Sequence, residues 1–150
     1  MLPPDVPPQR WRLVPYIAPD GKCPVNDELL DSLRENDPKA YLKFRECHAR
    51  ALEEHGPSIG EPRWKGLDDG LYEICWNGKN RGHNRIYCSP ERGKRIVMFG
   101  GDIKRWGKFD RGTRKVCKAR QADFRSPTYD QEQREISYMA RRRGRQNGVV

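Results

Sequence analysis

The sequence contains no apolar run near the roughly 18 residues that a membrane-spanning helix needs. Its first ten residues, MLPPDVPPQR, lack the charged and apolar regions of a secretory signal peptide. The five cysteines are an odd number without a C-x-x-C pair, which does not suit a disulfide framework. These absences predict a cytoplasmic protein with reduced thiols and no membrane partner.

Motifs for cofactors are also lacking. The Gly-Lys dipeptide at 107–108 is followed by Phe109 rather than Ser or Thr, so there is no Walker A loop, and no dinucleotide-binding fingerprint occurs. Cys75, His83 and Cys88 are residue types that bind zinc. Their spacing is irregular, however, and both cysteines fall on predicted strands, which favours small buried side chains. We therefore expect neither a metal nor a cofactor.

Charge is abundant and unevenly distributed. Residues 1–80 carry 11 Lys and Arg against 14 Asp and Glu, a net charge of −3. Residues 81–150 carry 19 against 7, a net charge of +12. This asymmetry predicts a polyanion-binding surface in the second half and favours it over a basic face that serves only solubility. The length of 150 residues suits one domain with flanking sequence.

We divide the chain into a Pro-rich extension over residues 1–10, a folded domain over 11–125 and a basic helical tail over 126–150. Residues 11–17 (WRLVPYI) suit a strand, which Pro15 confines to an edge of a sheet.

Two helices should follow as a hairpin. Asn26 can cap the first, and Asp37 followed by Pro38 is a typical start for the second. The Gly-Pro dipeptide at 56–57 supplies a C-cap and a stop. The inward faces should be formed by apolar residues at helical spacing: Leu29, Leu30, Leu33, Tyr41, Leu42, Phe44, Ala49, Ala51 and Leu52.

Beyond the hairpin the pattern becomes extended and then helical again. Residues 71–76, 85–88 and 95–99 are short strand-like segments separated by turn signals, which predicts an antiparallel meander and an α+β fold. A third helix should be capped by Asp110. A fourth should open with the capping-box spacing of Thr128 and Gln131. The residues expected to face inward are Val116, Ala119 and Ala122 in the third helix and Ile136, Met139 and Ala140 in the fourth.

Three segments carry a resemblance to a known family. Residues 63–74 (RWKGLDDGLYEI), 83–88 (HNRIYC) and 99–108 (FGGDIKRWGK) resemble, in combination, motifs of the RelE/ParE superfamily of toxins, in its HigB-like, phage-derived branch. The resemblance covers roughly residues 11–125. It implies a RelE-like fold, in which a small antiparallel sheet packs against an N-terminal helical hairpin and a C-terminal helix.

The resemblance also implies a function. The protein would be the toxin of a type II toxin–antitoxin system, a ribosome-dependent endonuclease that cuts mRNA without a metal. The implied partners are mRNA, the ribosome and a cognate antitoxin protein. By position, Arg85 matches the arginine of the central strand, and Lys104 and Arg105 match the basic pair after the last strand. The sequence departs from the family at the first meander strand, where some members carry lysines and this chain has Tyr72, Glu73 and Cys75, and its third helix has no tyrosine.

Metal-independent RNA cleavage needs a base, an acid and cations that stabilise the transition state. His83, with an ordinary pKa near ~6.5, suits either proton role, with Asp102 as a second option, and it could equally be a polar loop residue. Arg85 can clamp a phosphate, the alternative being a cross-strand ion pair with Glu73. Trp106 either stacks on a base or belongs to the core. The nucleic-acid-binding candidates are Lys65, Trp106, Lys108, Arg111, Arg114, Lys115, Lys118, Arg141, Arg142 and Arg143.

A second function from another class fits the same residues. A phage-derived protein could use this fold to bind nucleic acid or a host protein without cutting anything, because a fold does not determine a function.

Overall fold

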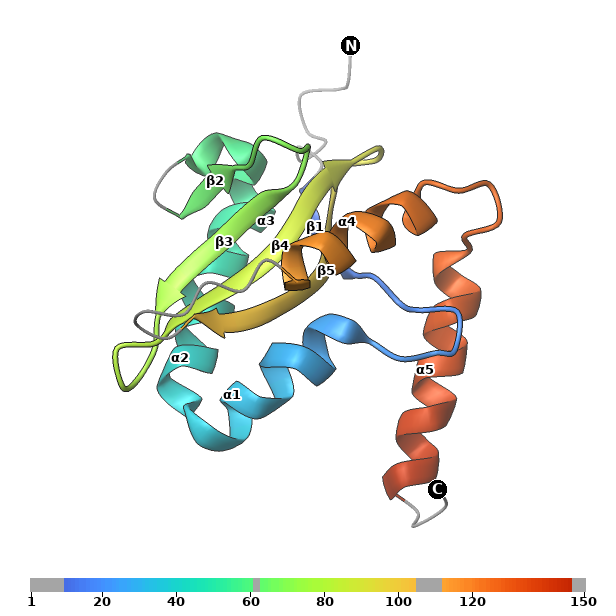
Figure 1. Ribbon diagram of the computed structural model, residues 1–150, viewed down its shortest axis with the longest axis horizontal. Coiled ribbons are helices and arrows are strands. Elements are labelled where there is room, and N and C mark those ends of the chain that lie inside the picture. Colours follow the sequence, from blue (N-terminus) through green and yellow to red (C-terminus); the bar gives the residue numbers. More distant parts are fainter. Residues whose placement is uncertain (1–9, 61–62, 105–111, 147–150) are drawn as a thin grey trace, which may run out of the picture.

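The computed structural model describes residues 10–60, 63–104 and 112–146, which form an α+β fold around an open five-stranded sheet (Figure 1). The strand order is β1-β5-β4-β3-β2. The strands are β1 (Arg12–Pro15), β2 (Trp64–Gly66), β3 (Tyr72–Asn77), β4 (His83–Glu91) and β5 (Arg95–Lys104).

The predicted meander is confirmed, because β3, β4 and β5 pair antiparallel in sequence order. The expectation of an antiparallel sheet is wrong at one edge, where β1 runs parallel to β5. The connection between these two strands contains the helical hairpin and strands β2, β3 and β4, which is long enough for the crossover that a parallel pair requires. Pro15 lies at the edge, as predicted, since it has no N–H for a central ladder.

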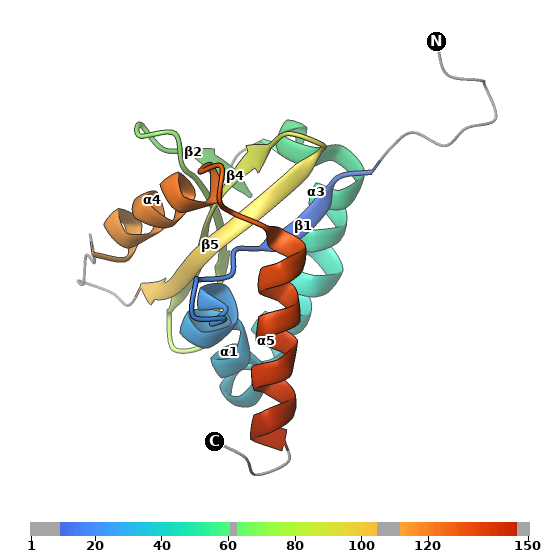
Figure 2. The ribbon, with the colours of Figure 1, turned by 90° about the vertical axis from the view of Figure 1, so that its right-hand side faces the viewer.

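The helical hairpin covers one face of the sheet (Figures 1 and 2). Its first helix contains a π-helical turn, η1 (Asn26–Leu30), and α1 (Asp31–Asn36). Its second contains α2 (Pro38–Lys43), the π-helical η2 (Phe44–Ala49) and α3 (Arg50–His55), followed by the 3₁₀ turn η3 (Gly56–Ile59).

The cap residues of the second helix are confirmed. The Asp37 side chain accepts a hydrogen bond from the Ala40 amide, and Gly56 has φ 62° at the end of α3. The predicted cap at Asn26 is wrong, since this residue lies inside the helix and its side chain donates to the Tyr138 hydroxyl at 2.8 Å. Leu42 is also misplaced by the prediction, being 51% exposed.

The largest core lies between the hairpin and the sheet. Trp76 is central to it, since its ring stacks on Phe44 and its Nε1 donates to the Ala40 carbonyl at 2.9 Å. His48 is buried beside the same indole. The remaining members include Leu29, Leu30, Leu33, Ala49, Leu52, Trp64, Ile74, Ile86, Cys88, Ile96 and Met98.

Helix α4 (Gly112–Phe124) crosses the opposite face of the sheet (Figure 2). Its buried residues are Cys117, Gln121 and Phe124. The predicted inward face is therefore wrong, because Val116, Ala119 and Ala122 are exposed to solvent. The polar Gln121 is buried because its amide donates to the Gly70 carbonyl and accepts from Lys118. The second core comprises Tyr16, Leu71, Tyr87, Val97, Phe99, Cys117 and Phe124.

Helix α5 (Gln131–Gln146) packs beside the segment that joins β1 to η1 (Figure 2). Asp130 rather than Thr128 caps it, accepting from the Gln133 amide at 3.1 Å. The predicted inward residues Ile136 and Met139 are 57% and 47% exposed, and Ala140 is exposed too. The helix docks instead through polar and aromatic side chains, described below. No helix among the described residues is long and apolar enough to span a membrane.

Candidate nucleic-acid interface

A groove of about 660 Å³ lies between α4 and the sheet. Six basic side chains line it against two acidic ones. They come from β2, β4, β5 and α4, and all six are among the residues predicted from the sequence. The lining residues are Lys65, Leu67, Asp69, Glu73, Arg85, Tyr87, Lys104, Arg114, Lys115 and Lys118.

Strand register explains why residues far apart in the sequence meet here. Side chains opposite each other on paired strands share one face of a sheet. Lys65 lies opposite Glu73, Glu73 opposite Tyr87, and Arg85 opposite Asp102, so this face carries a row of charged residues. Helix α4 then adds Arg114, Lys115 and Lys118 along one wall, within little more than one turn.

Arg85 forms a bidentate ion pair with Asp102, with Nε to Oδ1 at 2.8 Å and Nη2 to Oδ2 at 3.0 Å. The two side chains are only 9% and 14% exposed. Burial lowers the pKa of Arg85, but the hydrogen bonds and charge of Asp102 outweigh it and raise the pKa, so Arg85 stays protonated. The alternative partner expected from the sequence, Glu73, is therefore not the one that Arg85 has.

Asp69 fixes the wall formed by α4. Its carboxylate accepts from Arg114 Nε at 3.0 Å, and its backbone carbonyl accepts from the Lys118 ammonium. Burial raises the pKa of Asp69, but the Arg114 hydrogen bond and charge outweigh it and lower the pKa, so Asp69 is a carboxylate at neutral pH. The loop before β3 thus holds two of the basic residues at the groove.

Several predicted residues lie elsewhere. His83 is exposed at the start of β4, opposite Lys104, and does not line the groove. Arg105, Trp106, Lys108 and Arg111 fall outside the described residues, and the structure leaves their predicted roles open. No group of three or more His, Cys, Asp or Glu side chains within the described ranges could hold a metal ion.

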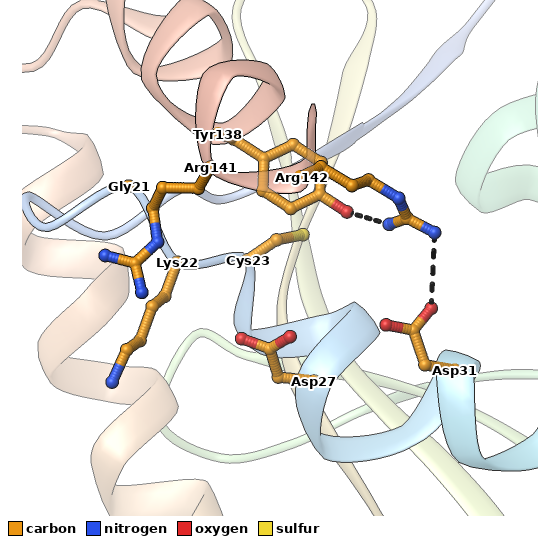
Figure 3. Close-up of a pocket in the computed structure, with 8 residues that line it drawn as sticks. All are labelled: Gly21, Lys22, Cys23, Asp27, Asp31, Tyr138, Arg141 and Arg142. Carbon is orange, nitrogen blue, oxygen red and sulfur yellow. Dashed lines mark hydrogen bonds and ion pairs between the residues drawn. The ribbon is translucent and has the colours of Figure 1, made fainter. Parts of the chain in front are cut away.

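Two predicted tail arginines hold α5 against the domain at a second, smaller cavity of about 230 Å³ (Figure 3). Arg141 donates to the Asp20 carbonyl at 3.0 Å. Arg142 contacts the Tyr138 hydroxyl and lies 3.9 Å from Asp31 (Figure 3). These two residues belong to a docking surface distinct from the groove, whereas Arg143 is exposed.

Sequence reasoning missed three residues of the groove region: Asp69, Tyr87 and, as the ion-pair partner of Arg85, Asp102. The alternation of residues along β4 places Tyr87 on the same face as Arg85, and this signal could have found it. Asp102 needed the register of β4 on β5 and the extension of β5 to Lys104, beyond the predicted strand 95–99.

The fold and the groove thus define a small α+β protein with a basic surface on one face of its sheet. No protein-family model matches the chain, and the comparison with curated proteins finds no match either.

Proposed function

We propose that this protein binds RNA in the basic groove and is an endoribonuclease toxin, similar to the RelE/HigB-like toxins, that cuts mRNA at the ribosome without a metal. The α+β fold supports the proposal, because it contains the N-terminal helical hairpin and the later helix packed on a sheet that the resemblance implies. In this proposal a cognate antitoxin protein holds the toxin inactive.

The observation that carries the proposal is the convergence of six basic side chains on one groove. Phosphate binding by Lys and Arg is electrostatic and releases counterions, so a groove whose six cations outnumber the nearby acids Asp69, Glu73 and Asp102 suits a nucleic-acid backbone. The protonated Arg85 lines this groove, and the edge of its planar guanidinium that Asp102 does not engage offers a donor that fits a phosphate oxygen.

The binding part is tested by the affinity for a single-stranded RNA oligonucleotide across a salt series. Lys65 and Lys115 are exposed and line the groove, so replacing both with Ala removes two positive charges there. The slope of log affinity against log salt should fall by about 1.4, at roughly 0.7 per phosphate contact. The matched control replaces Lys39 and Arg45 with Ala, since these two residues are exposed on the hairpin and do not line the groove. Equal slopes for the two variants would refute the groove as the RNA site.

The cleavage part is tested by inducible expression in bacteria, with growth and the integrity of translated mRNA followed together. Growth arrest with cut transcripts supports the toxin. Normal growth with intact transcripts at a confirmed protein level refutes it.

One observation favours the non-catalytic alternative. The described residues that line the groove include no histidine, and Arg85 is already held by Asp102. A protein with this arrangement could bind RNA without cutting it. RNA binding with the predicted salt dependence, combined with normal growth, would select this second function.

A further inference from the structure

Tyr87 belongs to the core beneath α4 and also lines the groove with the basic side chains. It is on β4, two residues after Arg85, and only 2% exposed. Its ring belongs to the core under α4 with Val97 and Phe99, yet the residue also lines the groove. The buried ring therefore fixes the position of a hydroxyl at the base of the basic surface.

The Tyr87 hydroxyl has no hydrogen-bond partner within the described parts of the chain. The other tyrosines on this side of the sheet are satisfied, since Tyr16 donates to Asp123 at 2.6 Å and Tyr129 bonds Gln131. The buried side-chain atoms without a partner in the described residues belong to His48 and Asn84, so the Tyr87 hydroxyl is not sealed from the groove and a ligand there can reach it.

The charges around Tyr87 indicate the kind of ligand. The Arg85 guanidinium lies 5.7 Å from the centre of the Tyr87 ring. Burial raises the pKa of Tyr87, and the charge of Asp102 raises it further, so the phenol stays protonated across the physiological range. It can donate a hydrogen bond to an anion but cannot serve as a base at neutral pH.

Asp102 also determines which part of Arg85 can reach a ligand. It engages Nε and Nη2 of the guanidinium, which leaves Nη1 outside the bidentate pair. A phosphate oxygen near Nη1 would then have a charged donor from Arg85 and a neutral donor from Tyr87, two residues apart on one strand.

We infer that the Tyr87 hydroxyl donates a hydrogen bond to a phosphate oxygen of the bound RNA, beside Arg85, with Asp102 as the positioning residue for the arginine. This inference rests on the proposed RNA binding and adds a neutral contact at one defined phosphate.

The test is Tyr87→Phe, which removes one oxygen and keeps the ring in its core. RNA affinity should fall about tenfold, as expected for a hydrogen bond to a charged group. The salt slope should stay that of the unaltered protein, because no charge is removed. The matched control is Tyr72→Phe on the neighbouring strand, since Tyr72 packs in the core of the other face. The melting temperature of each variant shows whether the fold is kept.

A second measurement locates the contact without relying on the variant's stability. A series of RNA oligonucleotides is used, each with one phosphate replaced by an uncharged methylphosphonate at a different position. At one position the replacement should lower the affinity of the unaltered protein more than it lowers the affinity of Tyr87→Phe. Unchanged affinity in Tyr87→Phe, or equal methylphosphonate losses in both proteins, would overturn the inference while RNA binding stands. Failure of the unaltered protein to bind RNA would overturn the proposed function and this inference with it.

Discussion

Removing the Asp102 carboxylate should destabilise the fold, because it leaves the Arg85 charge in a site where its side chain is 9% exposed. Breaking a buried ion pair by deleting one partner costs about 3–5 kcal/mol. Arg85 lines an open groove, so water reaches part of the guanidinium and the lower end, about 3 kcal/mol, applies. For a chain of this length, that loss lowers the melting temperature of Asp102→Ala by about 6–12 °C.

The assay is thermal unfolding followed by circular dichroism, with the double variant Arg85→Met/Asp102→Leu as the control. Replacing both partners by apolar residues of similar size is often neutral, so the double variant should melt near the unaltered protein. It should also bind RNA more weakly, because the groove has lost Arg85. An Asp102→Ala variant that melts within 2 °C of the unaltered protein would show that the groove hydrates Arg85 freely, and the argument from burial would fail.

Three further predictions concern other parts of the fold. Gly100→Ala should cost about 1–3 kcal/mol in urea unfolding, because a Cβ there would lie 2.9 Å from the Sγ of the buried Cys117 and would displace the paired ends of Glu28 and Arg120, and an unchanged midpoint would contradict this. Burial lowers the pKa of His48, so at mildly acidic pH the unfolded chain binds a proton that the folded chain does not. The stability contributed by the neutral, buried His48 is therefore fully present above pH ~6.5 and is lost as the pH falls toward the pKa of the folded state. The slope of unfolding free energy between pH 7.5 and 5.5 should therefore be shallower in His48→Phe, and identical slopes would refute the assignment. Arg134→Ala, which breaks a 2.6 Å ion pair with Asp123, should raise proteolysis within α5 but not within the sheet.

The parts of the fold that the sequence could predict are those with local chemical signals. Asp37 before Pro38 needs no tertiary contact to start a helix, and Gly56 reaches a positive φ more easily than other residues. Pro15 confined its strand to an edge for an equally local reason. The parallel pairing of β1 with β5 depends on how the helical hairpin folds back across the sheet, which no local pattern contains.

The faces of the last two helices were mispredicted because they bury polar groups. Apolar spacing finds an inward face only when that face is apolar. Helix α4 instead buries Gln121, whose amide is satisfied by the loop before β3. Helix α5 docks through Arg134, which bonds both Asp123 and the Ile17 carbonyl. Each choice depends on partners more than 10 residues away in the sequence.

The same difference between sequence signals and long-range contacts applies to the candidate site. The uneven charge of the two halves was sufficient to predict a basic surface. Many positive side chains in one half of a small domain must lie close together on its limited surface. Which cations are available to a ligand is decided by their acidic partners. Asp102 binds one edge of Arg85 and Asp69 binds Arg114, while Lys65 and Lys115 line the groove and are exposed. The exposed lysines should thus determine how strongly RNA is attracted to the groove. Arg85, which is held in place by Asp102, should determine where one phosphate of the RNA binds.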